Sequence, residues 1–213
     1  MEKLIKGKPV ADSIKKRLKV EVEGLKAKGI IPKLTIIRAG EDPGNIAYER
    51  GALKAMASVN IKADVRALPE NISEDDFINE LKSVNTDTST HGILILRPLP
   101  EQLDEKVLKN IILPEKDVDC FNPINVSKVL EGDETGFPPC TPAAVVEMLE
   151  FYNIDLKGIN AVVVGRSMIV GKPTALLLLK RHATVTICHS RTKNLPKVTS
   201  NAQLLIVGIG KAK

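Results

Sequence analysis

The segment AVVVGRSMIVGKP, residues 161–173, decides how the second half of this chain folds. Its first residues are small and aliphatic, which is typical of a buried strand, and the run ends at Gly165. A helix is expected to open near Gly171, so a tight turn joins the strand to the helix. Backbone N–H groups in such a turn meet phosphate at the start of the helix.

This turn leaves two interpretations open. The spacing is Gly165, Ser167, Gly171, and the usual GxGxxG pattern is absent. A strand–turn–helix in any α/β protein carries a glycine or two. The motif alone therefore supports a dinucleotide-binding role and a purely structural role about equally.

The next expected strand favours NADP over NAD. It lies in ATVTICHSRT, residues 183–192, and no acidic residue follows it to hold the ribose hydroxyls, as one does in NAD binders. Arg166, Ser190 and Arg191 can instead meet a 2′-phosphate, because a guanidinium matches phosphate geometry. The alternative interpretation is that Arg191 is a solvated loop residue.

Helix and strand patterns alternate along the whole chain, which predicts an α/β fold with parallel sheets. A capping box at Ser73 and Asp76 opens one of the helices. In chain order we expect helix 10–25, strand 34–39, helix 46–59, the capped helix, strand 92–96, helix 103–111, helix 143–151, strand 160–165, helix 173–181, strand 183–189 and strand 203–207.

Composition excludes several classes of protein. The 31 basic and 26 acidic residues give a net charge of +5, and only 3% of residues are aromatic, so we expect no nucleic-acid interface. The basic run at residues 15–19 is interpreted as a solvated helix face. No apolar run approaches the ~18 residues of a membrane span, so no membrane partner is expected.

The cysteines and histidines indicate reduced thiols and no metal. Cys120, Cys140 and Cys188 are far apart and show no CxxC spacing, which is typical of a cytoplasmic protein. The three histidines form no HExxH pattern, and we expect no metal site.

Several segments in order carry a more specific signal. They are RAGEDPGNIAYERGALKA (38–55), GILILRPLP (92–100), PEKDVDCFNP (114–123), PPCTP (138–142), and VVGRSMIVGKP with TVTICHS (163–173 and 184–190). Over nearly the whole chain they resemble the bifunctional methylenetetrahydrofolate dehydrogenase/cyclohydrolase family.

The resemblance implies a fold and an activity. Residues 1–145 would form a three-layer α/β folate-binding catalytic domain, and residues 146–213 a Rossmann-like NAD(P)-binding domain. The implied chemistry is NADP-dependent oxidation of 5,10-methylenetetrahydrofolate to 5,10-methenyltetrahydrofolate, then hydrolysis to 10-formyltetrahydrofolate, usually in a homodimer. Family members continue past the position of Lys213, so the second domain is expected to be incomplete.

The resemblance also implies site residues. Tyr48 and Asp119 match the candidate catalytic and folate-binding positions, and a carboxylate suits the pterin edge because it accepts two parallel N–H bonds. Without its motif, Asp119 would be interpreted as a loop cap. Thr141 and Pro142 match a stretch beside the substrate. The NADP positions are Gly165, Arg166, Ser167, Ile169 and Ser190.

Three positions depart from the family pattern. Its catalytic lysine, four residues after the tyrosine, is Ala52 here, and its glutamine is Leu96; Asn45 stands where the family has serine. Lys54 is about 240° around a helix from Tyr48, so it does not simply replace the lysine. Hydride transfer needs no side-chain base, whereas hydrolysis does. We therefore expect a dehydrogenase with weak or absent cyclohydrolase. One alternative keeps both activities, with another group standing in for the lysine; the other is a non-catalytic relative that binds folate or dinucleotide, or only pairs with another subunit.

Overall fold

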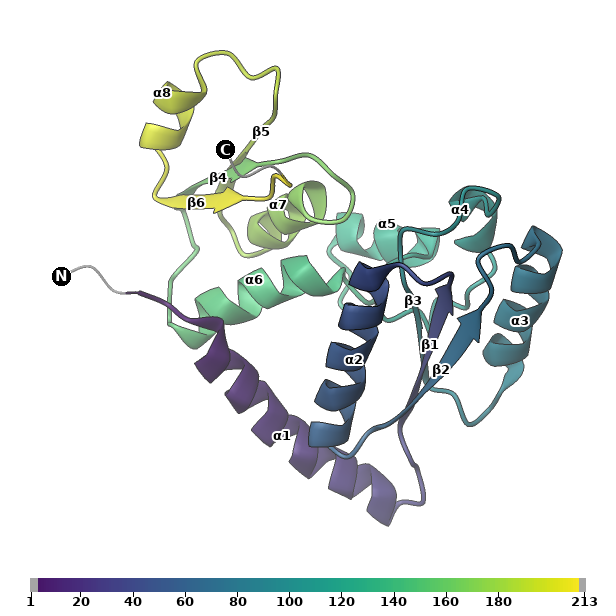
Figure 1. Ribbon diagram of the computed structural model, residues 1–213. Helices are drawn as coiled ribbons and strands as arrows, with labels where there is room; N and C mark the ends of the chain where they lie inside the picture. Colours follow the sequence, from purple (N-terminus) through teal and green to yellow (C-terminus); the bar gives the residue numbers. More distant parts are fainter. Residues whose placement is uncertain (1–3, 211–213) are drawn as a thin grey trace. The chain divides into compact units, whose positions relative to one another are not determined.

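The computed structural model describes residues 4–210, which form two compact units, each built on a parallel three-stranded sheet (Figure 1). We call residues 8–123 the N-terminal unit, and residues 124–210 with the segment before Lys8 the C-terminal unit. Every strand pairing is parallel, which confirms the expected α/β class. Across residues 4–210, each helix is too short or too polar to serve as a membrane span.

The elements follow the alternating order expected of this class. Those that begin before residue 110 are α1 (Gly7–Ala27), β1 (Lys33–Ala39), α2 (Pro43–Ser58), β2 (Lys62–Leu68), α3 (Glu74–Thr86), β3 (Gly92–Ile95) and α4 (Glu105–Leu108). The later ones are α5 (Pro123–Glu131), α6 (Cys140–Phe151), β4 (Asn160–Val164), α7 (Gly171–Lys180), β5 (Thr184–Cys188), α8 (Leu195–Ser200) and β6 (Leu204–Val207).

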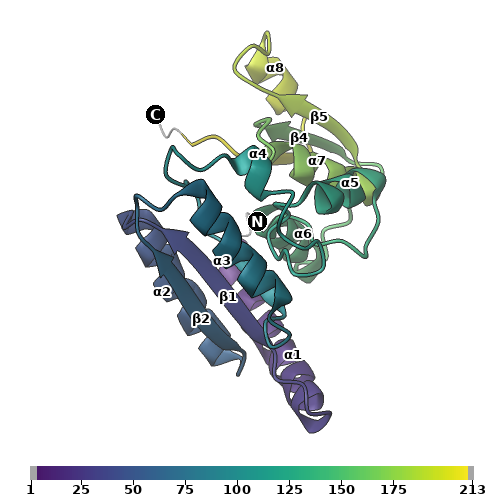
Figure 2. The ribbon, with the colours of Figure 1, turned by 90° about the vertical axis from the view of Figure 1, so that its right-hand side faces the viewer.

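The N-terminal unit has three layers, with β1 in the middle of a sheet ordered β2-β1-β3. Successive residues of a strand point to opposite faces of the sheet. Ile36 accordingly packs with Ala52 and Leu53 of α2, while Ile37 packs with Phe77 of α3. Figure 2 shows α3 in front of this sheet and α2 behind it. Burial on both faces explains the aliphatic composition of β1 and β3.

The C-terminal unit repeats this plan with β4 in the middle of a sheet ordered β5-β4-β6. Val163 faces Leu178 of α7 and Leu149 of α6, whereas Val164 faces Leu195 of α8. The strand that the sequence placed at residues 160–165 is thus a buried central strand. Its carboxyl end is where the glycine turn begins.

Strand β2, Lys62–Leu68, was not expected from the sequence. It lies at the edge of its sheet, and most of its residues are half-buried or exposed. Lys62, Asp64 and Arg66 alternate along it, so it has no continuous aliphatic run. Edge strands tolerate such charges because one side of the strand meets water. Helices α5 and α8 were also not expected.

The helix expected over residues 103–111 is wrong in extent, because α4 covers four residues, Glu105–Leu108. After it, the backbone forms tighter turns, with Ile111 N–H donating to Leu108 O at 3.0 Å. Two asparagine side chains then take the next carbonyls: Asn85 donates to Ile111 O and Asn122 to Ile112 O, both at 2.7 Å. Side-chain amides from elsewhere in the unit thus replace helical hydrogen bonds.

A polar network closes the amino end of the N-terminal sheet. The ammonium group of Lys33 lies 3.2 Å from Asp64 and 3.3 Å from Asp87. The buried Thr35 hydroxyl donates to Asp64 at 2.8 Å, and Thr90 donates to Asp87 at 2.9 Å. The network therefore ties β1, β2 and the end of α3 together.

We expect Asp87→Asn to lower the melting temperature at pH 7, and this deficit to shrink in acid. Hydrogen bonds from the Ser89 hydroxyl and backbone, then from Thr90, hold the pKa of Asp87 far below its ordinary value of 3.8. A carboxyl whose pKa is lowered by folding stabilises the fold above its unfolded pKa, and this contribution is lost as the pH falls further. Thermal denaturation from pH 7 down to pH 2 measures this. The exposed Glu101→Gln is the control, and a deficit that stays constant with pH would contradict the assignment.

Candidate active site

In both sheets the strand order reverses direction at the central strand, and the carboxyl end of that strand is the topological switch point. In each, the chain steps from the centre to one edge and then crosses to the other: β1, β2, β3 in one sheet and β4, β5, β6 in the other. Ligands of doubly wound folds bind outside the carboxyl ends of the strands at such a point. The loops after β1 and β3, and those after β4 and β6, are therefore the candidate binding edges.

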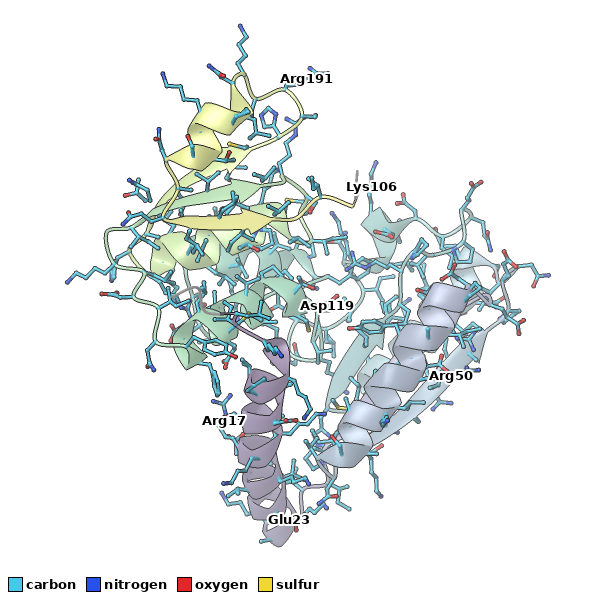
Figure 3. The ribbon with its side chains drawn as sticks, turned by 60° about the vertical axis from the view of Figure 1, so that its left-hand side comes forward. Arg17, Glu23, Arg50, Lys106, Asp119 and Arg191 are labelled. Carbon is cyan, nitrogen blue, oxygen red and sulfur yellow. The ribbon has the colours of Figure 1, made fainter. Side chains whose placement is uncertain are left out.

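The loop that carries Asp119 is held rigid by Asp117. The Asp117 side chain is 1% exposed and accepts backbone N–H bonds from Asp119 at 3.2 Å, Phe121 at 3.0 Å and Asn122 at 2.9 Å. The first aspartate of the DVD motif is thus structural. Asp119 is partly exposed and lies on the loop near the end of the N-terminal unit (Figure 3).

Cys120 directly follows Asp119 in the same loop. Burial, with the nearby carboxylates of Asp117 and Asp119, raises the pKa of the Cys120 thiol to about 12. The thiol is therefore protonated at neutral pH, and protonated thiols attack poorly. Within the described residues, no His, Cys, Asp and Glu side chains gather as metal ligands would.

Helix α2 carries both Tyr48 and Ala52, the residue that stands where the family has its lysine. Tyr48 is 57% exposed, so its ring is available at the surface of the unit. Ala52 packs into the cluster of Ile36, Leu94 and Leu96. Lys54 is exposed and is not part of that cluster. The two departures, Ala52 and Leu96, thus belong to one apolar cluster.

Asn45 ties the start of α2 to the loop after β3. Its side chain is buried, with 5% of the residue exposed, and donates to Pro98 O at 3.3 Å. Its backbone N–H donates to the capping carboxylate of Asp42 at 2.8 Å. The asparagine therefore fixes the loop that carries Arg97 and Pro98 relative to the helix that carries Tyr48. The sequence showed Asn45 as a departure but not this role.

Three glycines shape the carboxyl edge of the second sheet. Gly165 has φ +140°, and a Cβ there would lie 2.7 Å from Gly208 O. A Cβ on Gly171 would lie 2.2 Å from Gly165 O, and one on Gly208 would lie 2.9 Å from a methyl carbon of Val170. Backbone from β4, α7 and the end of β6 therefore meets at distances that no side chain permits. Gly208 was missed because its role depends on a strand pairing.

The turn between β4 and α7 presents the expected cofactor positions. Arg166, Ser167 and Ile169 are exposed, whereas Gly165 is buried. The Ser167 hydroxyl accepts the N–H groups of Val170 at 3.1 Å and Gly171 at 3.4 Å. The Ser167 hydroxyl therefore accepts N–H groups at the end of the turn and at the first residue of α7, so it already has a structural role there.

The loop after β5 brings Ser190 to the same edge, because Val164 pairs with Cys188 in the sheet. The loop closes on itself: His189 N–H donates to the Thr192 hydroxyl at 2.8 Å, and Arg191 N–H donates to His189 Nδ1 at 3.1 Å. Ser190 and Arg191 are exposed, and Figure 3 shows Arg191 on this loop, next to α8. Arg166 and Ser190 each lie two residues beyond the paired strand ends.

Thr141 and Pro142 lie in the first turn of α6, which begins at Cys140. The helix therefore starts three residues before the expected 143, because proline is tolerated in a first turn where no intrahelical N–H bond is needed. Thr141 is exposed and Pro142 is buried.

A doubly wound parallel sheet with a glycine-tight strand–turn–helix defines the class of dinucleotide-binding α/β proteins. The family comparison agrees: residues 5–119 match the catalytic domain of tetrahydrofolate dehydrogenase/cyclohydrolase, and residues 139–213 match its NAD(P)-binding domain. The chain belongs to the tetrahydrofolate dehydrogenase/cyclohydrolase family.

Relatives and solved structures support this assignment. The chain is 56% identical to the bifunctional protein FolD of Alkaliphilus metalliredigens, over 99% of this chain and 74% of that protein. It is 57% identical to FolD of Clostridioides difficile, over 99% and 73%. The Campylobacter jejuni FolD structure has a TM-score of 0.93 and 42% identity, covering 96% of this chain and 72% of that one. The Trypanosoma brucei FolD structure, complexed with NADP cofactor and inhibitor, has a TM-score of 0.92 and 32% identity, covering 98% and 72%.

Proposed function

We propose that this chain is an NADP-dependent methylenetetrahydrofolate dehydrogenase whose cyclohydrolase activity is weak or absent. The observation that carries the proposal is the apolar cluster that Ala52 and Leu96 share in the N-terminal unit. The glycine turn after β4 in the C-terminal unit supports the dehydrogenase part of the proposal. Residues 1–145 would supply the folate site and residues 146–213 the dinucleotide site, in a homodimer.

The residues at the edge of the second sheet fit NADP. The glycine contacts among Gly165, Gly171 and Gly208 bring backbone, rather than side chains, to the surface where a pyrophosphate approaches. Arg166 and Ser190 are exposed beside it and would hold a 2′-phosphate. Ile169 supplies an apolar surface in the same turn. When bound, NADP supplies the hydride acceptor.

In the N-terminal unit, Asp119 would bind the pterin edge and Tyr48 would line the folate site. The Asp117 bonds keep the Asp119 backbone in place before substrate arrives, which lowers the entropic cost of orienting the substrate. Thr141 and Pro142, at the start of α6, are further candidates for substrate binding. Oxidation needs no more from the side chains than this positioning, because the cofactor accepts the hydride.

Hydrolysis of the methenyl product makes a different demand. A water must be placed and deprotonated, and a positioned side chain contributes about 10²–10⁴-fold to such a step. Ala52 and Leu96 have no group that moves a proton. Lys54 lies two residues beyond Ala52 on α2, about 200° around the helix, so we do not expect it to replace the missing amine.

We expect the purified chain to reduce NADP with methylenetetrahydrofolate, and to hydrolyse methenyltetrahydrofolate at less than about tenfold over buffer, since the base is missing. Absorbance assays follow both steps on the same sample. Hydrolysis far above background would contradict the proposal. If neither reaction occurs, a thermal shift with NADP or folate separates a ligand-binding relative from a subunit-pairing one, because a ligand stabilises only a chain that binds it.

A further inference from the structure

Arg97 lies at the folate edge and contacts two groups of the Asp119 loop. It follows Leu96 directly, at the carboxyl end of β3. Its Nη2 atom is 3.4 Å from Asp119 Oδ2, and its Cζ atom is 5.2 Å from the centre of the Phe121 ring. The side chains of Arg97 and Asp119 are 24% and 29% exposed, so the pair is well shielded but still reachable from solvent.

The two contacts of Arg97 have different functions. A guanidinium over an aromatic face is attracted to the ring electrons, and this attraction restrains the Arg97 side chain. Phe121 is itself held, because its N–H donates to the buried Asp117 at 3.0 Å. A guanidinium anchored in this way presents its N–H groups in a fixed direction, and one of them points at the Asp119 carboxylate.

Asp117 and Arg97 act on different parts of Asp119. Asp117 accepts the backbone N–H of Asp119, whereas Arg97 contacts the side-chain carboxylate. A carboxylate binds two parallel N–H donors well only when its plane faces them. The Arg97 contact restrains this side chain, because its Nη2 atom donates to Asp119 Oδ2 at 3.4 Å.

We propose that Arg97 is a positioning residue that orients the Asp119 carboxylate toward the paired N–H donors of the pterin ring. This inference rests on the proposed function. In this proposal the Arg97 cation acts on the substrate through Asp119. Arg97 does not replace the lysine that is missing at residue 52.

A double-mutant cycle on tetrahydrofolate binding tests this proposal. We expect Arg97→Leu to weaken binding about tenfold, and Asp119→Asn to weaken it about 10–100-fold, as for bonds to charged groups. The double variant should bind no more weakly than Asp119→Asn, because Arg97 acts through that carboxylate. Arg97→Lys should fall between wild type and Arg97→Leu, since lysine keeps the charge but not the planar stacking. Titration calorimetry of the full chain measures all four variants.

Arg66→Leu is the matched control. Arg66 forms a comparable contact, 3.5 Å from Glu80, in the same unit but on β2 and α3, and its removal should leave folate affinity unchanged. With methylenetetrahydrofolate, Arg97→Leu should raise KM more than it lowers kcat. Additive losses in the cycle, or tighter binding by Arg97→Leu, would overturn the inference alone. A wild-type chain that does not bind tetrahydrofolate would overturn the proposed function as well.

Discussion

Gly171→Ala is expected to destabilise the C-terminal unit and to abolish NADP binding at concentrations that saturate the wild type. The added methyl carbon would lie 2.2 Å from the carbonyl oxygen of Gly165, 2.4 Å from its carbonyl carbon and 2.7 Å from Arg166 N. These neighbours are backbone atoms, which no rotamer change can move. Overpacking costs about 1–3 kcal/mol in a typical core, and we expect at least the upper value here. The turn that meets the cofactor phosphates would open as a result.

Chemical denaturation and an NADP titration measure the two effects separately. Gly24→Ala is the control, because Gly24 lies in the interior of α1 with no heavy atom within 4 Å of an added Cβ. There the same substitution should stabilise by about 0.5–1 kcal/mol, as for glycine in an open helix position. Wild-type NADP affinity in Gly171→Ala would show that the tight approach of the two glycines is not needed for the site.

The double substitution Ala52→Lys with Leu96→Gln is expected to raise the rate of methenyltetrahydrofolate hydrolysis by about 100-fold over wild type. The lysine would restore a group that moves a proton, and such groups contribute about 10²–10⁴-fold. Residues 48 and 52 are one helical turn apart on α2, so the new amine would share a face with Tyr48. The rate of NADP reduction should change much less.

Each single substitution should gain less than the pair. An amine introduced at residue 52 alone would lie against the apolar cluster of Ile36, Leu94 and Leu96. Such surroundings disfavour the charged form and give the amine no hydrogen-bond acceptor. Lys54→Ala serves as the control and should leave both activities unchanged, because Lys54 is exposed and outside the cluster. Hydrolysis by the double variant at the wild-type rate would show that these two positions do not account for the missing activity.

The central strands of both sheets could be predicted from the sequence, because burial on two faces favours apolar residues. Strand β4 has the unbroken run AVVV, and β1 is mostly apolar from Leu34 to Ala39. The capping box at Ser73 also gave a correct helix start: the Ser73 hydroxyl accepts the N–H of Asp76 at 3.1 Å. Strand β2 escaped prediction because its pairing, and not its composition, makes it a strand. Helix α4 was predicted too long for the opposite reason. Apolar residues continue at helical spacing, but the carbonyls of Ile111 and Ile112 accept hydrogen bonds from asparagine side chains instead of from a continuing helix.

The candidate site divides in the same way. The resemblance to the family singled out Asp119 and Tyr48 as candidates, and the strand–turn–helix spacing singled out the glycine turn. Contacts between distant residues needed the tertiary structure: Arg97 with Asp119, Asn45 with Pro98, and Gly165 with Gly208. The physical reason is that helix and turn signals act over a few neighbouring residues, whereas strand pairing brings residues tens of positions apart into van der Waals contact. The residue types of the candidate site could therefore be read from the sequence, whereas the partners that orient them were decided by the packing within each unit.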